Sequence, residues 1–245
     1  MINGKKVLCV IPARAGSVGL KNKNLRALHG KSLVGWAATI ASRIHSIDEV
    51  VVSTDSNEIA GEAIRNGARF LGLRPIELSG PSVHDQQVLT DTLIKIEAAL
   101  NYEFDIVVML QPTSPLRTID EVNSCLEEVA SLNRTACWTI SGVDLKFHFR
   151  KQLTIDGDSQ LRRSVDGPRV VARQDLDPTF VRNGACYVFT RETLLKEPNL
   201  MGWNCGYVLS EGVRPNIDTL EDLTAAIEIS RINQETGLLE ERETH

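Results

Sequence analysis

Several features that would assign this chain of 245 residues to a class at once are missing from its sequence. No stretch approaches the roughly 20 consecutive apolar residues that a membrane-spanning helix needs. The apolar run near the N-terminus is too short for a secretory signal and lacks a small-residue cleavage site. The net charge is −5, so there is no overall basic field that would attract nucleic acid. These absences favour a globular protein that binds neither membranes nor nucleic acids.

The sequence also lacks the usual patterns of disulfide and metal sites. Its five cysteines are far apart and form no Cys-x-x-Cys pair, and its five histidines show no His-x-x-x-His spacing. Free cysteines within apolar runs behave as small hydrophobic residues. We therefore expect reduced thiols, a cytoplasmic location and no zinc site.

The length allows one sizeable domain, which we expect to span residues 1–245. Apolar, β-branched runs alternate with segments of helical periodicity. The candidate strands are residues 7–11, 49–53, 106–110, 136–140 and 185–189. The candidate helices are residues 33–44, 59–66, 88–100 and 122–132. Buried strands separated by single helices predict βαβ units and a mostly parallel sheet, with ligands bound beyond the carboxyl ends of its strands.

Helix starts are marked as well. Thr118 with Glu121 forms a capping-box pattern, and Thr219 with Asp222 approximates one.

Residues 145–175 interrupt the alternation of strands and helices. This segment holds seven Lys or Arg residues against four Asp residues, although the whole protein is acidic. A long structureless loop is uncommon inside a compact domain, so we expect hairpins that project as an arm at about residues 141–182. The arm is either a solvated surface excursion or a cover for a site or a partner subunit.

A glycine-rich, cationic loop follows the first predicted strand, in the stretch VIPARAGSVGLKNKN. It matches neither the Walker A pattern nor the GxGxxG pattern. The backbone N–H groups between Gly16 and Gly19 can form an anion-binding nest, to which Arg14, Lys21 and Lys23 add positive charge. This combination favours a phosphate site, while a merely polar loop remains the alternative.

Two further stretches fall at the same predicted edge of the sheet. In QPTSPLR, Gln111 can both donate and accept hydrogen bonds, as recognition of a hydroxylated, carboxylate-bearing substrate requires. In PNIDTLEDL, Asp218 stands directly before a helix. It either stabilises the helix dipole or, beside a triphosphate, supplies a carboxylate ligand to Mg²⁺.

Five stretches in this order and spacing resemble the acylneuraminate cytidylyltransferases: IPARAGSVGLKNKN, LRPIEL, QPTSPLR, ARQDLDPTFVRNGACYVF and NIDTLEDL. The resemblance covers roughly residues 5–232. It implies a Rossmann-like α/β nucleotidyltransferase fold and a homodimer formed through the projecting arm. It also implies that CTP is coupled to a nine-carbon sugar acid, giving a CMP-sugar and pyrophosphate.

The resemblance also implies roles for individual residues. The loop residues that it assigns to the phosphates and ribose of CTP are Arg14, Ser17, Lys23 and Asn24. Arg74, with Pro75, is assigned to the cytosine side of the pocket. The residues assigned to the sugar acid are Gln111, Arg173, Asn183 and Tyr187, with Lys146 reaching the substrate of the partner subunit. Asp218 is the implied Mg²⁺ ligand, and Arg14, Lys23, Gln111 and Asp218 form the predicted catalytic set.

The chain departs from the family pattern at two positions. Val18 stands where the loop usually has lysine, and Asn216 replaces the first aspartate of a usual Asp-x-Asp pair. Loss of one charge-assisted phosphate contact costs about 1.5–3 kcal/mol, so a weakened enzyme is one alternative. Lys21 is a candidate for supplying the missing charge, and Asn216 still offers an oxygen to a hard cation.

The identity of the sugar acid stays open at this stage. Sialic, legionaminic and pseudaminic acids all fit the resemblance. The eight-carbon acid Kdo is a weaker candidate, because the loop lacks the SxRLPxK pattern usual in that family. A non-catalytic nucleotide-binding relative and a dinucleotide-dependent oxidoreductase are the alternatives from other classes, and the oxidoreductase lacks its glycine fingerprint.

Overall fold

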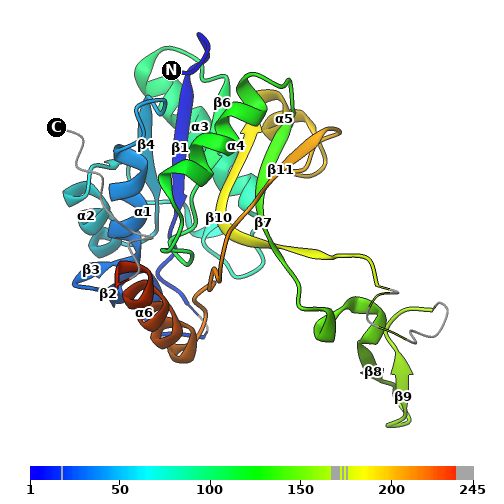
Figure 1. The fold of residues 1–245 in the computed structure, drawn as a ribbon. Coiled ribbons are helices and arrows are strands. Elements are labelled where there is room, and N and C mark those ends of the chain that lie inside the picture. The colour runs from blue at the N-terminus through cyan, green and yellow to red at the C-terminus, as the bar shows by residue number, and fades with distance from the viewer. Residues whose placement is uncertain (18, 167–171, 173, 175, 236–245) are drawn as a thin grey trace.

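The structure, a computed structural model, describes residues 1–17, 19–166, 172, 174 and 176–235. Its centre is a seven-stranded sheet in the order β11-β7-β10-β6-β1-β4-β5 (Figure 1). The strands are β1 (Val7–Pro12), β4 (Glu49–Ser53), β5 (Arg69–Phe70), β6 (Ile106–Met109), β7 (Ala136–Gly142), β10 (Phe180–Thr190) and β11 (Cys205–Leu209). All adjacent strands are parallel except β10, which runs antiparallel to both β6 and β7. The predicted mostly parallel α/β sheet is therefore confirmed.

Helices cover both faces of this sheet. The helices are α1 (Leu33–Ser42), α2 (Asn57–Arg65), α3 (Asp85–Leu100), α4 (Ile119–Ala130), α5 (Arg191–Lys196) and α6 (Leu220–Glu235). Alternate side chains of β1 enter opposite cores: Cys9 packs with apolar residues of α1, α2 and α4, and Leu8 with those of α3 and α5. Burial on both faces explains why this strand is an unbroken apolar run.

Side-chain caps fix the starts of several helices. The Thr118 hydroxyl accepts a hydrogen bond from the Glu121 amide, and the Glu121 carboxylate accepts one from the Thr118 amide. Thr219 and Asp222 exchange the equivalent pair at the start of α6. Both predicted capping boxes are confirmed. The apolar side of α6 packs in a small separate core with the short hairpin of β2 (Ala27–Leu28) and β3 (Lys31–Ser32).

The cysteines are buried rather than paired. All five are free; Cys9, Cys125, Cys137 and Cys186 are buried, and Cys205 is half-buried. Burial raises the pKa of the Cys9 thiol to about 12, with a smaller opposing effect of Arg117. In the part of the chain that the structure describes, no helix is long and apolar enough to cross a membrane.

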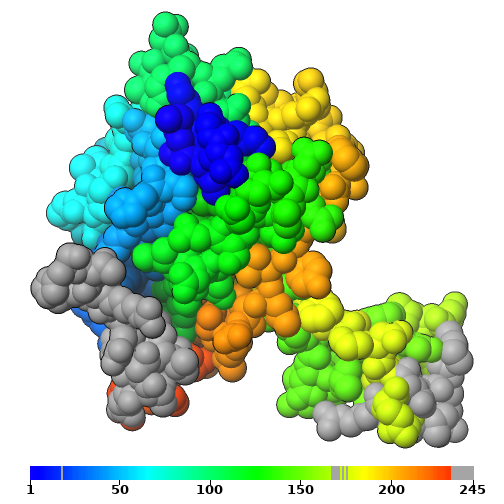
Figure 2. All heavy atoms as spheres, turned by 45° about the horizontal axis from the view of Figure 1, so that its top comes forward, coloured from blue at the N-terminus to red at the C-terminus, as the bar shows by residue number. Residues whose placement is uncertain are grey.

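The segment after β7 leaves the body of the molecule. It contains the short helices η3 (Leu145–Phe147) and η4 (Phe149–Lys151) and an antiparallel hairpin of β8 (Leu153–Ile155) and β9 (Leu161–Arg163). In the space-filling view it forms a separate lobe that extends from one side of the body (Figure 2). The expected hairpin is present, and we refer to residues 141–182 as the arm.

Candidate active site

Two cavities adjoin: the first lies at the carboxyl ends of β1 and β6, and the second extends along the sheet between α3, α5 and β10. The first encloses about 390 Å³, and the second about 1090 Å³. Polar and charged residues that line the first cavity include Arg14, Ser17, Lys23, Asn24, Arg74, Asp85, Gln111, Asn216 and Asp218. Residues that line the second include His84, Asp85, Asp91, Trp138, Arg182, Tyr187 and Phe189.

The loop after β1 is held open by contacts to neighbouring segments. The Ala15 amide donates to the Asp55 carboxylate at 2.7 Å, and the buried Asn24 side chain donates to the Arg14 carbonyl at 2.8 Å. The Ser17 amide is itself bonded to the Ala15 carbonyl at 2.9 Å. The loop therefore offers Arg14 and Lys23 to the cavity, while part of the predicted amide nest is already used within the protein.

An ion pair joins this loop to the segment before α6. The Lys23 ammonium lies 2.6 Å from the Asp218 carboxylate, whose side chain is 66% exposed. The backbones approach closely as well: a Cβ atom on Gly19 would lie 2.5 Å from the Asp218 carbonyl oxygen. Glycine is therefore required at position 19 for the loop to reach Asp218.

Arg74 brings a third cation to the first cavity. It is 7% exposed, its amide donates to the Thr54 carbonyl at 2.8 Å, and its Nε has no protein partner. Burial lowers the pKa of its guanidinium, which the Asp55 charge raises and the Arg14 charge lowers. A buried guanidinium donor without a partner costs free energy unless a ligand accepts its hydrogen bond, so its Nε marks a polar contact point.

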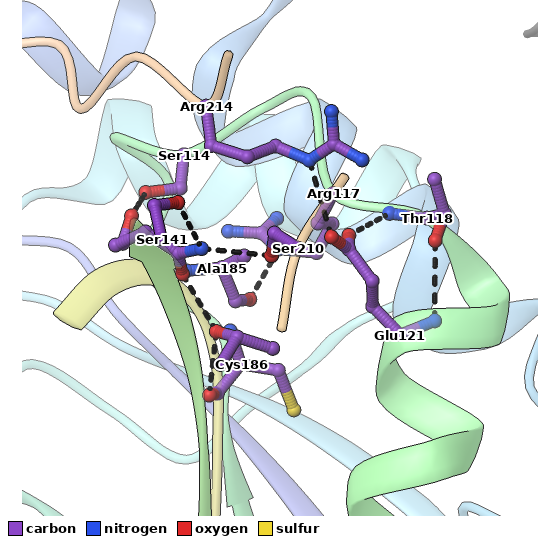
Figure 3. Close-up of polar contacts among 11 residues, drawn as sticks. Ser114, Arg117, Thr118, Glu121, Ser141, Ala185, Cys186, Ser210 and Arg214 are labelled. Carbon is purple, nitrogen blue, oxygen red and sulfur yellow. Dashed lines mark hydrogen bonds and ion pairs between the residues drawn. The ribbon is translucent and has the colours of Figure 1, made fainter. Parts of the chain in front are cut away.

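Gln111 is positioned through its backbone by a buried arginine. Arg117, 3% exposed, donates to the Gln111 carbonyl and, at 2.7 Å, to the Ala185 carbonyl of β10. Burial lowers the pKa of Arg117 to about 10, so it stays charged at neutral pH. Figure 3 shows Arg117 with Ser114, Ala185 and the nearby ion pair of Glu121 with Arg214, whose atoms lie 3.1 Å apart. These contacts fix the QPTSPLR loop against β10.

The NGACY stretch forms an irregular turn within β10. The strand register shifts between Arg182 and Tyr187, and Gly184 has a φ of +77°. The Asn183 carboxamide is 4% exposed and accepts from Thr139 at 2.7 Å, while its amide group donates to Ser210 at 2.8 Å. The Tyr187 hydroxyl accepts from the Gly184 amide at 2.9 Å. Asn183 is thus committed to the fold, whereas the Tyr187 ring lines the second cavity.

The cytidylyltransferase family model matches residues 8–154, more than half of the chain. The chain belongs to the cytidylyltransferase family. The CMP-N,N'-diacetyllegionaminic acid synthase of Legionella pneumophila is 28% identical to it, over 94% of this chain and 98% of that protein. The N-acylneuraminate cytidylyltransferase of Streptococcus agalactiae is 30% identical, over 91% of this chain and 52% of that protein.

One solved structure has a fold similar to that of this cytidylyltransferase. It is a CMP-2-keto-3-deoxy-manno-octonic acid synthetase in complex with CTP, with a TM-score of 0.63 and 20% identity over 95% of this chain and 99% of that one. Because only 20% of the residues are identical, the similarity between the two structures shows a shared fold and nothing about substrate. Together with the family match, it confirms the predicted nucleotidyltransferase fold and enzyme class.

The cytidylyltransferase fold brings most of the predicted site residues together. The predicted catalytic set, Arg14, Lys23, Gln111 and Asp218, lines one cavity with Ser17, Asn24 and Arg74. Lys146 lies apart from it on the arm, where its ammonium is 3.2 Å from Asp144 and 4.8 Å from the Phe147 ring centroid. Arg173 and Val18 lie outside the described residues. Lys21 is exposed and is not among the described residues that line the first cavity.

Asp85, Trp138 and Arg182 are among the residues of this cytidylyltransferase's cavities that were not predicted from sequence. Asp85 lines both cavities, and Trp138 and Arg182 line the second. Asp85 precedes the apolar periodicity of α3, which begins at Val88, so the helical pattern did not include it. Arg182 stands directly before the NGACY stretch, and this adjacency was the one available signal.

The donor set around Asp218 is suited to Mg²⁺ only together with a bound phosphate. Among the described residues, no group of three His, Cys, Asp or Glu side chains could hold a metal ion by itself. Asp218 and Asn216 nevertheless present a carboxylate and an amide to the first cavity. Mg²⁺ commonly takes one or two carboxylates and completes its shell with phosphate oxygens and water, so these residues fit that ion.

Proposed function

We propose that this cytidylyltransferase couples CTP to a nonulosonic sugar acid, such as legionaminic, pseudaminic or N-acetylneuraminic acid, and releases pyrophosphate. The observation that carries the proposal is the pair of adjoining cavities with different chemistry. One is small and cationic, and the other is larger and contains aromatic rings. Two unlike substrates bound side by side need this arrangement.

CTP occupies the first cavity in this proposal. Arg14, Lys23 and Arg74 place three cationic groups in one cavity of a protein whose net charge is −5. Against the two carboxylates among the described residues of the same cavity, Asp85 and Asp218, this leaves an excess of one positive charge. Guanidinium and ammonium groups are the usual protein partners of phosphate, so the set suits a triphosphate. Ser17 and Asn24 lie beside the phosphates and ribose, and Arg74 lies on the cytosine side.

The sugar acid occupies the second cavity. The rings of Trp138 and Tyr187 meet edge to face with centroids 5.2 Å apart and offer apolar surface to a sugar ring. Arg182 adds a guanidinium, which can hold a carboxylate by two parallel hydrogen bonds. Gln111 lines the first cavity beside Asp85, at the boundary residue of the second, and donates to and accepts from sugar hydroxyls. Arg173 and the residues around Asn183 are the remaining residues that we propose for binding of the sugar acid.

The protein acts in this reaction mainly by positioning and charge stabilisation. The anomeric hydroxyl of the sugar attacks the α-phosphorus of CTP, and pyrophosphate leaves. Arg14 and Lys23 hold the phosphates and stabilise the negative charge that develops on the leaving pyrophosphate. Asp218, assisted by Asn216, holds Mg²⁺, which when bound neutralises phosphate oxygens and polarises the α-phosphate.

A magnesium titration tests the role of Asp218. We expect Asp218→Ala to raise the Mg²⁺ concentration needed for half-maximal pyrophosphate release about tenfold or more, because the carboxylate ligand is lost. Glu221→Ala, at an exposed position in the first turn of α6, serves as the control. An unchanged titration in Asp218→Ala would remove Asp218 from the metal site.

A substrate panel tests the function as a whole. The purified full chain is incubated with CTP and Mg²⁺ and with N-acetylneuraminic, legionaminic, pseudaminic or Kdo acid, and pyrophosphate release is followed. We expect turnover with at least one of the three nine-carbon acids. Turnover with Kdo alone would reassign the substrate, and CTP binding without any turnover would indicate the non-catalytic relative.

A second copy of this chain is the partner that we propose for the arm. The hairpin exposes large apolar side chains, among them Leu153 (58% exposed), Ile155 (73%) and Leu161 (68%). Such residues on a projecting lobe favour association over solvation. Lys146, on the same arm, would then reach toward the substrate of the partner subunit, and the active protein would be a homodimer.

A further inference from the structure

Asp85 occupies the boundary between the two cavities. Among the described residues, only Val83 and Asp85 line both of them. Val83 carries no polar side-chain group, so Asp85 alone brings a side chain that can accept a proton to the place where the two substrates would meet. Asp85 is the first residue of α3, a helix of 16 residues whose body is packed against β1 and β4.

The contacts of Asp85 keep its carboxylate at this boundary. Its Oδ2 atom accepts a long hydrogen bond, 3.4 Å, from the Gln111 side chain. Gln111 is in turn anchored through its carbonyl to the buried Arg117. The carboxylate is half-buried and faces two substrate cavities while retaining unused acceptor capacity.

Charged groups from several elements surround this carboxylate. Arg182 and Tyr187 face it from β10, Arg74 from the loop after β5, Gln111 from the loop after β6, and His84 from its own segment. Partial burial raises the pKa of Asp85, while Arg182, Arg74, the Gln111 hydrogen bond and His84 lower it, and burial has the larger effect. A carboxylate with a raised pKa is a stronger base than one in free solvent.

The other carboxylates of the two cavities are already engaged. Asp218 is paired with Lys23 at 2.6 Å, and we assign it to the metal. Asp91 lines the second cavity alone and is paired with Lys95 at 2.7 Å. This leaves Asp85 as the acidic side chain best placed to act on the attacking hydroxyl.

We propose that Asp85 is the general base of the reaction, an inference that rests on the proposed function. The anomeric oxygen of the sugar acid forms a bond to the α-phosphorus of CTP and gives its proton to the Asp85 carboxylate. The bond from the α-phosphorus to the α,β-bridging oxygen breaks, and its electron pair leaves with pyrophosphate. Asp85 then releases the proton to solvent, and the site is restored.

Kinetics of Asp85 variants across pH test this assignment. Asp85→Asn keeps the shape and the Gln111 contact but removes the proton acceptor, so we expect kcat to fall about 100-fold or more. Wild-type kcat should rise with pH through the pKa of Asp85, and this acid limb should vanish in Asp85→Asn. Asp85→Glu should restore part of the rate. The CTP dissociation constant, measured by calorimetry, should change less than twofold.

Asp120→Asn is the matched control, because Asp120 is an exposed aspartate in the first turn of α4 and lines neither cavity. A kcat within threefold of wild type in Asp85→Asn would overturn the proposal. So would a lowered kcat that keeps the wild-type acid limb, since Asp85 would then only position the substrate. A wild-type protein without turnover on the substrate panel would instead refute the proposed function, and the Asp85 proposal would fall with it.

Discussion

Two cations of the first cavity, Lys23 and Arg74, differ in whether the protein itself supplies a partner for the charged group. Lys23 is paired with Asp218, whereas Arg74 has one buried donor without a protein acceptor. An exposed ion pair of this kind contributes little to stability, with typical values of about 0–1 kcal/mol. These charged side chains therefore contribute little to the stability of the fold, and ligand binding is the role that they fit better.

Neutralising the loop cations should affect catalysis far more than folding. We expect Lys23→Ala and Arg14→Ala each to lower CTP-dependent pyrophosphate release by more than tenfold, because a charge-assisted phosphate contact contributes about 1.5–3 kcal/mol. Arg43→Ala, at an exposed position at the far end of α1, should leave the rate unchanged. Full turnover in both loop variants would contradict the phosphate assignment.

Ionisation of Asp85 at rising pH should lower the stability of the folded protein. Its pKa is raised in the folded state, so folding holds its proton more tightly than the unfolded chain does. The stabilisation this brings is complete below the ordinary aspartate pKa of about 3.9 and is lost as pH rises through the raised pKa. The Tm of Asp85→Asn relative to wild type should therefore increase as the pH rises above about 4. A pH-independent Tm difference in thermal unfolding would argue against a desolvated carboxylate.

At the scale of single elements, β10 connects the second cavity to the arm. Its inner half pairs antiparallel with β6, and its outer half, beyond the register shift, pairs with the end of β7. Between these halves, Gly184 adopts a left-handed conformation against the QPTSPLR loop. A Cβ atom there would lie 2.5 Å from the Ser114 hydroxyl and 2.8 Å from the Gln111 side-chain oxygen. The turn and the position of Gln111 are therefore coupled.

Gly184→Ala tests this coupling. The left-handed conformation costs a non-glycine residue roughly 1–2 kcal/mol, so we expect a measurable loss of stability in denaturant unfolding. Displacement of Gln111 should also lower turnover several-fold. Gly142→Ala, where a Cβ atom would meet nothing within 4 Å, is the matched control. Wild-type activity and stability in Gly184→Ala would show that the loop can move without consequence.

At the scale of the whole molecule, the arm gains little from contact with the body. Its hairpin strands are exposed on every residue, and they stand apart from the central sheet (Figure 1). A hairpin of two strands is marginally stable alone, so packing against another surface would stabilise it. A second copy of the chain is the partner we propose for this purpose.

Charged side chains on the apolar face of the hairpin should prevent formation of the proposed dimer. Ile155 and Leu161 are directly opposed in the β8–β9 pairing, so their side chains share one face. We expect the wild type to be a dimer by light scattering after size-exclusion chromatography, and Ile155→Glu with Leu161→Glu to be a monomer. Thr154→Glu, on the other face, is the control. A monomeric wild type would refute the proposed partner.

The sequence alone predicted the parts of the fold that depend on buried apolar runs. Strands β1, β4, β6 and β7 were found because their apolar, β-branched residues are buried, and the caps of α4 and α6 were found from local hydrogen-bonding patterns. The strand β5 was missed because its two residues are too few to form an apolar run, and the partly exposed edge strand β11 was missed although most of its residues are apolar. The antiparallel direction of β10 has no signature in its residues.

For the site, the sequence by itself determined the chemical groups and, through its motifs, the cytidylyltransferase family. Local patterns suffice for this, because a cationic glycine loop or a capped aspartate is contained in a few consecutive residues. Only the tertiary structure decided which of these groups meet: Lys23 with Asp218, Gln111 with Arg117 and Asp85, and Arg182 with the second cavity. Those contacts join residues far apart in the chain, and they depend on strand order and helix packing, which no short stretch of sequence encodes.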